Sequence, residues 1–158
     1  MRIKTTKKIV EEVKITDQNS AINENMLSIL FETKTLHSFK RGNRTVAEVD
    51  HLIVEINQLF GIEEKTTLVR VRSIHNAYVE LKDTEIGISE ERIRFLVVKE
   101  RLPHVKVGNR VYIALESFEA PYNESLIYDD YMDSKQASIE KHIEEQFAKS
   151  LARREKRR

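Results

Sequence analysis

The chain has 158 residues, a length that favours one compact domain or two very small ones. With 34% charged residues it is expected to be soluble and globular, and the absence of cysteine excludes disulfides and cysteine-ligated zinc. No apolar stretch approaches the roughly 18 residues of a membrane-spanning helix, and the first residues lack the apolar core of a signal peptide. We therefore expect a cytoplasmic protein that does not contact membranes.

Charge is separated along the sequence, although the net charge is only +1. Basic side chains gather in residues 34–44, in residues 92–110 and in the tail from Lys149, whereas residues 116–133 carry acids and no Lys or Arg. Separated basic blocks indicate either a face that binds a polyanion or ordinary solvated helix surfaces.

The first part of the sequence predicts two helices and a hairpin. Residues 9–13 supply one apolar face of a first helix, and the turn after it ends at Asn19 or Ser20. A second helix is expected over residues 22–33, and residues 37–44 lead through Gly42-Asn43. The apolar positions of the second helix are Ile22, Met26, Leu27, Leu30 and Phe31.

Residues 44–60 support two interpretations, and we retain both. Thr45 and Glu48 have the spacing of a capping box, which would open a long helix there. The preceding hairpin instead favours a short strand at residues 44–46, followed by a helix through Phe60 that stops at Gly61. The apolar positions of this helix are Val46, Val49, Leu52, Ile53, Ile56, Leu59 and Phe60.

A similar order of elements is clearer in residues 67–118. Residues 67–72 predict a strand, Ser73 caps a helix, Gly87 breaks the chain, and Ser89 caps a second helix that Pro103 stops. Residues 104–107 and 110–113, joined by Gly-Asn, predict a two-stranded hairpin, and a short helix begins at residue 115. The apolar faces of the two helices are Ile74, Ala77, Tyr78 and Leu81, and then Ile93, Leu96 and Val97.

Beyond Pro121 the sequence is acidic up to Asp133, and residues 134–158 predict a helix with a basic end. Its apolar stripe is narrow and follows steps of four, as in a coiled-coil seam, but it lasts under three heptads, which favours packing on its own protein or projection into solvent. The stripe consists of Ile139, Ile143, Phe147 and Leu151.

An internal repeat links the two helix–helix–hairpin segments. Residues 40–44 (KRGNR) and 106–110 (KVGNR) are 66 positions apart, and the same ungapped offset aligns residues 22–52 with residues 88–118. Apolar positions are preserved along this alignment, so we expect a duplication. The expected domains are residues 1–61, a first unit with its connecting helix; residues 62–121, a second unit; and residues 122–158, an acidic segment with a basic helix.

The second copy carries a motif of fixed spacing, ISEERIRFL at residues 88–96 followed by LPHVKVGNRVYI at residues 102–113. It resembles the DNA-binding modules of the excisionase and MerR-like family, in which a Ser-capped recognition helix ends at Leu-Pro and a basic wing turns at Gly. Two such modules in one chain resemble the TraN-type internal dimers of Gram-positive conjugative plasmids. The first copy departs from the pattern, because His37 stands where Pro103 does.

This resemblance implies two tandem winged helix-turn-helix units that form a pseudo-two-fold internal dimer, in a mainly α fold with small antiparallel β-hairpins (α+β). It also implies binding to double-stranded DNA near a transfer region, with a role in relaxosome function or in transcriptional control of transfer. An excisionase-type architectural factor that bends DNA is an alternative. A second alternative is a protein-interaction adaptor that docks through the acidic segment and the last helix.

The expected DNA-reading side of each second helix lies opposite its buried face. An arginine there can pair with guanine, an apolar side chain can meet a thymine methyl, and an asparagine can read adenine. Core packing of Phe95 and Val98 is the competing interpretation. The recognition-helix candidates are Arg92, Arg94, Phe95, Val98 and Lys99 in the second copy, and Asn25 and Ser28 in the first.

The hairpins are the expected backbone-binding wings, because basic side chains beside a recognition helix lie naturally near phosphates. Asn43 and Asn109 have turn formation as their competing role, and the basic tail is either a source of non-specific affinity or a solubilising end. The wing candidates are Lys40, Arg41, Asn43, Arg44, Lys106, Asn109 and Arg110.

Nothing in the sequence predicts catalysis. The five histidines show no metal-ligand spacing, and no Walker loop, dinucleotide turn or nucleophile elbow occurs. We expect no enzyme activity, no metal and no cofactor. The expected partner is double-stranded DNA, with conjugation or transcription machinery beside it, bound by a monomer that acts as an internal dimer.

Overall fold

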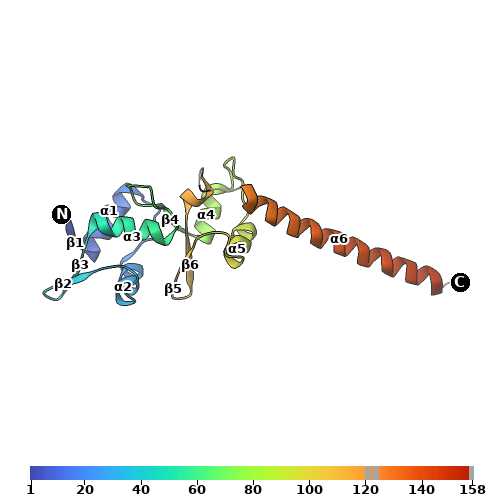
Figure 1. Ribbon diagram of the computed structural model, residues 1–158, viewed down its shortest axis with the longest axis horizontal. Helices are drawn as coiled ribbons and strands as arrows, with labels where there is room; N and C mark the ends of the chain where they lie inside the picture. The colour runs from blue at the N-terminus through green and yellow to red at the C-terminus, as the bar shows by residue number, and fades with distance from the viewer. Residues whose placement is uncertain (120–121, 123–124, 157–158) are drawn as a thin grey trace. The chain divides into compact units, whose positions relative to one another are not determined.

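The computed structural model describes residues 1–119, 122 and 125–156, with the side chains of the last helix described from Ser138 onward. The chain divides into two units, Met1–Asn123 and Glu124–Arg158. Unit 1 combines short helices with two small antiparallel three-stranded sheets, and unit 2 is a long helix (Figure 1). The expected α+β class, a mainly helical chain with small antiparallel sheets, is therefore confirmed.

The first half of unit 1 is a three-stranded sheet with two helices between its first and second strands. The hairpin β2–β3 returns the chain so that β3 lies between β1 and β2. Its elements are β1 (Ile3–Thr5), α1 (Thr6–Thr16), α2 (Glu24–Glu32), β2 (Phe39–Arg41), β3 (Arg44–Glu48) and α3 (Val49–Leu59).

The second half has the same order and the same sheet topology, with β6 between β4 and β5. A short 3-10 helix, η1, follows where the first half has α3. Its elements are β4 (Val71–Ser73), α4 (Ile74–Leu81), α5 (Glu90–Val98), β5 (Val105–Val107), β6 (Arg110–Ala114) and η1 (Leu115–Phe118).

The two halves repeat each other residue by residue over much of their length. α5 begins and ends 66 positions after α2, and both strands of the second hairpin begin 66 positions after those of the first. Strand pairing repeats as well, since Thr5 faces Val46 as Ser73 faces Tyr112. The offset found in the sequence is therefore an offset between equivalent structural elements.

Side-chain caps start α2 and α5 at equivalent residues. The Asn23 side chain accepts a hydrogen bond from the backbone N–H of Met26 at 2.8 Å, and the Ser89 hydroxyl accepts one from that of Arg92 at 3.1 Å. Each cap satisfies one of the N–H groups left free at a helix start. The predicted cap at Ser89 is confirmed, and the first copy begins its helix at Glu24 rather than at residue 22.

Two positions beyond the last residue of each helix, a non-glycine residue lies in the left-handed region: Lys34, with φ 59°, follows α2, and Glu100, with φ 55°, follows α5. These residues are also 66 positions apart. The prediction that Pro103 stops the second helix is wrong, because α5 ends at Val98 and Glu100 turns the chain before the proline is reached. A left-handed residue just beyond the last turn is a common way to end a helix.

The capping-box interpretation of Thr45 is wrong. Residues 44–48 form β3, because β3 is held on both sides by β1 and β2, and pairing on both edges overrides the local helix signal. α3 starts at Val49, and the carboxylate of Glu48 caps it by accepting hydrogen bonds from the N–H groups of Asp50 and His51. The expected order of a strand followed by a helix is confirmed, and the strand extends to Glu48, two residues further than predicted.

Two further expectations are corrected by strand pairing. The predicted strand over residues 67–72 is shorter and later, at Val71–Ser73, because β4 pairs with β6 only over those three residues. The hairpins, expected as two-stranded, belong to three-stranded sheets, because β1 and β4 add to their inner edges.

One hydrophobic core joins the two halves of unit 1. Buried residues of α1, α2 and α3 cluster with Val71, Val107 and Tyr112 from the second half. Phe60 and Ile62, each 1% exposed, carry the core from α3 toward β4. The backbone N–H of Ala21 also donates to the carbonyl of Val71 at 2.9 Å. The halves therefore share part of their packing and belong to one compact unit.

Unit 2 contains α6 (Ser125–Lys156), which begins nine residues before the predicted helix. Its apolar stripe at Ile139, Ile143, Phe147 and Leu151 is exposed. Arg157 and Arg158 of the expected basic tail, and the side chains of the acidic stretch from 123 to 133, lie outside the described residues. Among the helices described, none is long and apolar enough to cross a membrane.

Candidate nucleic-acid interface

α5 exposes a basic and apolar outer side. Its inner face is packed, with Ile93 and Leu96 at 0% and 1% exposure. On the outer side, 62% of the Arg94 side chain is exposed and Val98 is 77% exposed. Core packing of Val98 is thereby excluded, which leaves this side chain available to a partner.

The remaining candidates on α5 lie around this outer side. Arg94 forms an ion pair with Glu90 at 3.0 Å, one helical turn earlier. Phe95 is half-buried, and the Lys99 ammonium lies 6.0 Å from its ring centroid, at the outer limit of a cation–π contact. Arg92 is also half-buried. The outer side of α5 therefore offers two exposed cations and one exposed aliphatic side chain.

α2 has a different surface. Asn25 and Ser28 are exposed as predicted, but the nine residues of α2 include Glu24 and Glu32 and no Lys or Arg. A helix of this charge is less suited to phosphates than α5, although an exposed Asn retains the hydrogen-bonding groups that pair with adenine.

The candidate residues of both hairpins are exposed. They are Lys40, Arg41, Asn43, Arg44, Lys106, Asn109 and Arg110. Gly42 and Gly108 occupy the first loop positions with φ 65° and 61°, which the tight two-residue turn requires and which glycine adopts without strain. The turn thus places a basic side chain on each side of each hairpin tip. The Lys40 ammonium also donates to the Thr45 hydroxyl across the hairpin at 2.6 Å.

Both hairpins lie on the same side of unit 1 as α2 and α5. In Figure 1 these four features lie along the lower edge of unit 1, whereas α1 and α4 lie along its upper edge. The second helix and the hairpin of both copies therefore lie along one edge of the unit in this view, although they come from segments 66 positions apart.

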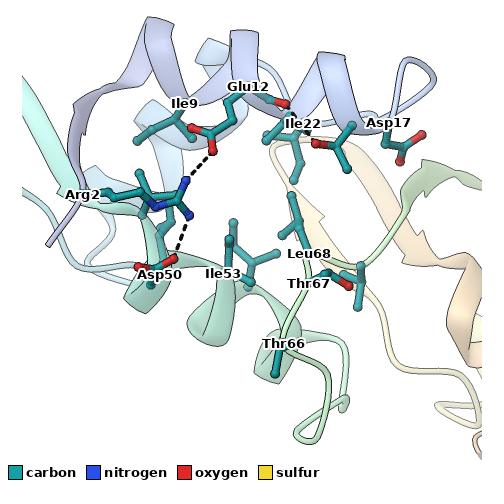
Figure 2. A pocket seen from close by; sticks show the side chains of 16 residues that line it. Arg2, Ile9, Glu12, Asp17, Ile22, Asp50, Ile53, Thr66, Thr67 and Leu68 are labelled. Carbon is teal, nitrogen blue, oxygen red and sulfur yellow. Dashed lines mark hydrogen bonds and ion pairs between the residues drawn. The ribbon is translucent and has the colours of Figure 1, made fainter.

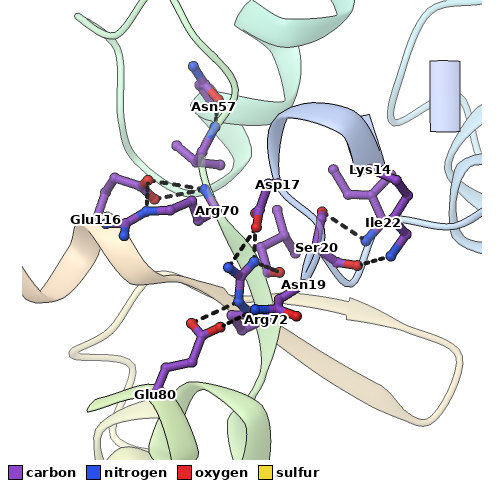
Figure 3. A network of polar contacts seen from close by, with 12 residues as sticks. Lys14, Asp17, Asn19, Ser20, Ile22, Asn57, Arg70, Arg72, Glu80 and Glu116 are labelled. Atoms are coloured by element: carbon purple, nitrogen blue, oxygen red, sulfur yellow. Dashed lines mark hydrogen bonds and ion pairs between the residues drawn. The ribbon is translucent and has the colours of Figure 1, made fainter. Parts of the chain in front are cut away.

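A buried arginine ties the two halves together (Figure 3). The side chain of Arg72 is 4% exposed and makes two parallel contacts to the Asp17 carboxylate, at 2.7 and 2.8 Å, and one to Glu80 at 3.0 Å. Burial lowers the pKa of Arg72, but its hydrogen bonds to both carboxylates outweigh this and raise it. This bidentate pair joins the end of α1 to β4 and α4, so it fixes how the two helix pairs lie to each other.

A second polar group holds the segment between the halves. The Asn57 side chain of α3 accepts from the Val69 N–H and donates to the Thr67 carbonyl, both at 2.9 Å. The Glu116 carboxylate, 5% exposed, accepts hydrogen bonds from the backbone and guanidinium of Arg70 and from the Lys65 ammonium. Burial would raise the pKa of Glu116, but together these hydrogen bonds lower it.

A small cavity lies away from this edge, between α1, α3 and residues 66–69 (Figure 2). Its volume is about 220 Å³, below the roughly 300–1,000 Å³ of most small-molecule sites, and much of its lining is aliphatic. Arg2, at its rim, contacts Glu12 at 2.6 Å and Asp50 at 2.7 Å. These carboxylates are thus already paired, and we assign the cavity no ligand.

Sequence reasoning missed the residues that position the interface. Arg72 and Glu116 were not singled out, because a charged residue in an apolar segment has no local signature of its partner. Their partners, Asp17 and Arg70, lie 55 and 46 positions away. The alternation of valine and arginine over residues 69–72 is typical of a strand whose arginines face solvent, so the local pattern does not indicate that Arg72 is buried.

Comparisons with known proteins give no relative for this chain. No protein-family model matches it, and no match was found among curated proteins or among solved structures.

Proposed function

We propose that this chain is a cytoplasmic, non-enzymatic protein that binds double-stranded DNA with two winged helix-turn-helix units acting as a pseudo-two-fold internal dimer. The observation that carries the proposal is the repeated order of two helices followed by a basic hairpin, which occurs twice in one unit. In each copy the helix–helix–hairpin order has the parts that a winged reader of the major groove requires.

The chemistry of the exposed side chains supports this assignment. Arg94 carries the fork of donors that pairs with guanine, and Val98 offers an apolar contact for a thymine methyl. Lys40, Arg44 and Lys106 project from the hairpins, where cations meet phosphates. The two helices would contribute unequally, since α5 carries the basic side chains and α2 carries Asn25 and Ser28.

The resemblance to excisionase, MerR-like and TraN-type modules supports a narrower role. On this basis we propose a protein of a conjugative plasmid or other mobile element, which binds near the transfer region as a transcriptional regulator or relaxosome accessory factor. Excisionase-type bending of DNA is the closest variant of the same proposal.

A second candidate function is a protein-interaction adaptor. It is favoured by α6, whose four apolar side chains are 44–66% exposed along one stripe. Such a stripe is suited to a partner helix. Salt dependence separates the two functions, because phosphate binding releases counterions and weakens steeply with salt, whereas apolar docking does not.

The wings provide the direct test. We expect Lys106→Ala with Arg110→Ala to weaken binding to all duplexes alike and to lower the slope of log affinity against log salt by about 2, one unit for each lost phosphate contact. Fluorescence anisotropy on labelled duplexes over a range of salt concentrations measures both quantities.

The matched control is Lys7→Ala with Lys8→Ala, which removes the same charge from exposed positions on α1, outside the hairpins and outside α2 and α5. An unchanged slope in the control and a reduced slope in the wing variant support the proposal. Equal slopes in the wild type and in a folded wing variant would contradict the wing assignment.

A further inference from the structure

Three side chains with metal-binding chemistry converge on the first half of unit 1, and sequence analysis did not connect them. His37 lies between α2 and β2, while His51 and Glu55 lie one turn apart on α3. One ligand atom from each lies within 4.8 Å of the others. We propose that His37, His51 and Glu55 bind a divalent transition-metal ion of the zinc type.

One of the two distances between ligand atoms already suits a tetrahedral ion, and the other becomes suitable when His37 moves outward. Oε2 of Glu55 lies 2.6 Å from Nδ1 of His37, and Oε1 lies 3.4 Å from Nε2 of His51. Ligand atoms around tetrahedral zinc are about 3.3 Å apart, as bond lengths of roughly 2.0–2.2 Å dictate. The Glu55–His51 distance already matches this value, whereas the Glu55–His37 distance is that of a hydrogen bond. The exposed imidazole of His37 must therefore move outward by about 0.7 Å as an ion takes the place of the bridging proton.

The donor set and its exposure point to the same class of ion. Two imidazoles and one carboxylate form a set that zinc accepts with a water as fourth ligand, whereas magnesium and calcium prefer oxygen ligands. The side chains of His37 and His51 are 81% and 60% exposed, so an ion reaches them from solvent without opening the fold.

The carboxylate at the centre is held in place without the ion. The Glu55 side chain is only 12% exposed, and both of its oxygens accept from the backbone N–H of His37 at 3.3 Å. Hydrogen bonds that orient a ligand from outside the coordination sphere are typical of metal sites. Binding of an ion therefore costs less conformational entropy at Glu55 than it would at a mobile surface glutamate.

The site belongs to one copy of the repeat. At the offset of 66, the second copy has Pro103, Ser117 and Pro121, which do not form such a ligand set. Because His37 lies two residues before β2, an ion there ties the root of the first hairpin to α3. At the equivalent position of the second copy, the ring of Pro103 restrains the backbone. The segment before each hairpin is therefore restrained differently, by a bound ion in the first copy and by a proline in the second.

The test is a titration of the full-length protein with Co²⁺, followed by optical absorption, and with Zn²⁺, followed by calorimetry. We expect one equivalent to bind, with the visible spectrum of four-coordinate Co²⁺. His37→Ala, His51→Ala and Glu55→Gln should each weaken binding by more than about 10-fold, the lower end of the loss caused even by removing an outer partner of a ligand. Cysteine contributes no background, since the chain has none.

The matched control is His75→Ala. His75 lies 3.4 Å from Glu90, but no third ligating side chain joins this pair in the described part of the chain. The control should bind the ion as the wild type does. Zn²⁺ should also raise the unfolding midpoint of the wild type and of the control more than that of the three variants, because an ion that binds only the folded state stabilises it.

Three results would overturn the proposal: no equivalent bound more tightly than millimolar by the wild type, unchanged affinity in His37→Ala and His51→Ala, or equal weakening in the control. Both histidine side chains are exposed, so their removal should leave the fold intact, and circular dichroism checks this. Because the readout involves no DNA, its failure and a failure of the proposed function are distinguishable.

Discussion

Arg94 is the residue on which the proposed sequence readout by α5 depends most directly. It is exposed, lies on the outer side of the helix and contacts Glu90, which is also exposed to solvent in part. An ion pair of this kind contributes little to stability, so the guanidinium can exchange Glu90 for a base at small cost. The side chain is therefore available to DNA without loss of the fold.

We predict that Arg94→Ala costs roughly 1–3 kcal/mol of binding free energy on the preferred site and much less on random duplexes, because a bidentate base contact is lost. Competition binding with both duplexes measures the difference. Arg94→Lys is the control that keeps the charge but loses the paired donors, and it should behave like the alanine variant on the preferred site. Equal losses on both duplexes would mean that Arg94 contacts only the backbone.

Glu116 carries a pH-dependent part of the stability. Its pKa in the folded protein is lowered below the ordinary value of 4.5, since hydrogen bonds from Arg70 and Lys65 outweigh the effect of burial. A group whose pKa is lowered by folding stabilises the folded state above its ordinary pKa, and this contribution is lost as the pH falls through the folded pKa.

We therefore expect Glu116→Gln to lower the free energy of unfolding by about 1.5–3 kcal/mol at neutral pH, the range for hydrogen bonds to a charged group. The difference from the wild type should shrink as the pH falls below about 4.5. Urea unfolding at a series of pH values gives both results, with Glu63→Gln at an exposed position as control. A difference that stays constant with pH would show that Glu116 does not act through its charge.

At the scale of elements, the ends of α2 and α5 store strain at equivalent places. Lys34 and Glu100 have positive φ, which costs an L-residue roughly 1–2 kcal/mol and costs glycine far less. We predict that Glu100→Gly raises the free energy of unfolding by about 1 kcal/mol, even though it adds backbone freedom to the unfolded chain.

Thermal unfolding measures this effect, and Glu100→Ala is the matched control, because alanine removes the same carboxylate but keeps the Cβ. A gain in both variants would assign the effect to the lost charge. A gain in the glycine variant alone assigns it to the backbone.

Elements that depend on local signals were predictable from sequence, and elements that depend on distant pairing were not. Ser73 and Ser89 cap helices as predicted, and Gly108 turns the second hairpin, because each acts within a few residues. The end of β3 and the start of α3 were missed, because β1 fixes them from more than 40 positions away. Most candidate contact residues are exposed, with Arg92 and Phe95 half-buried, while the groups that position them were visible only in the fold.

At the scale of the whole molecule, the spacing of α2 and α5 is fixed within one unit. The shared core, the bidentate contact between Arg72 and Asp17, and the Asn57 contacts to the connecting segment all join the two halves. If the chain binds DNA as proposed, the second helix reaches it at a high effective concentration once the first has bound, so that useful affinity needs no dimer.

We predict that one chain binds each site and protects two adjacent major-groove segments on one face of the DNA. Ordinary helix-turn-helix dimers reach half-sites roughly 34–36 Å apart with two chains, and the duplication supplies both units here. The competing arrangement is a dimer through the exposed stripe of α6. Light scattering of the free protein and of its DNA complex measures the number of chains, and footprinting measures the protected segments.

The control variant is Ile143→Asp with Phe147→Asp, at positions 61% and 66% exposed, which disrupts the apolar stripe of α6 and changes no residue of unit 1. One chain per site in both proteins supports the internal dimer. Two chains per site in the wild type, with binding abolished in the variant, would show that the two copies of the repeat do not suffice.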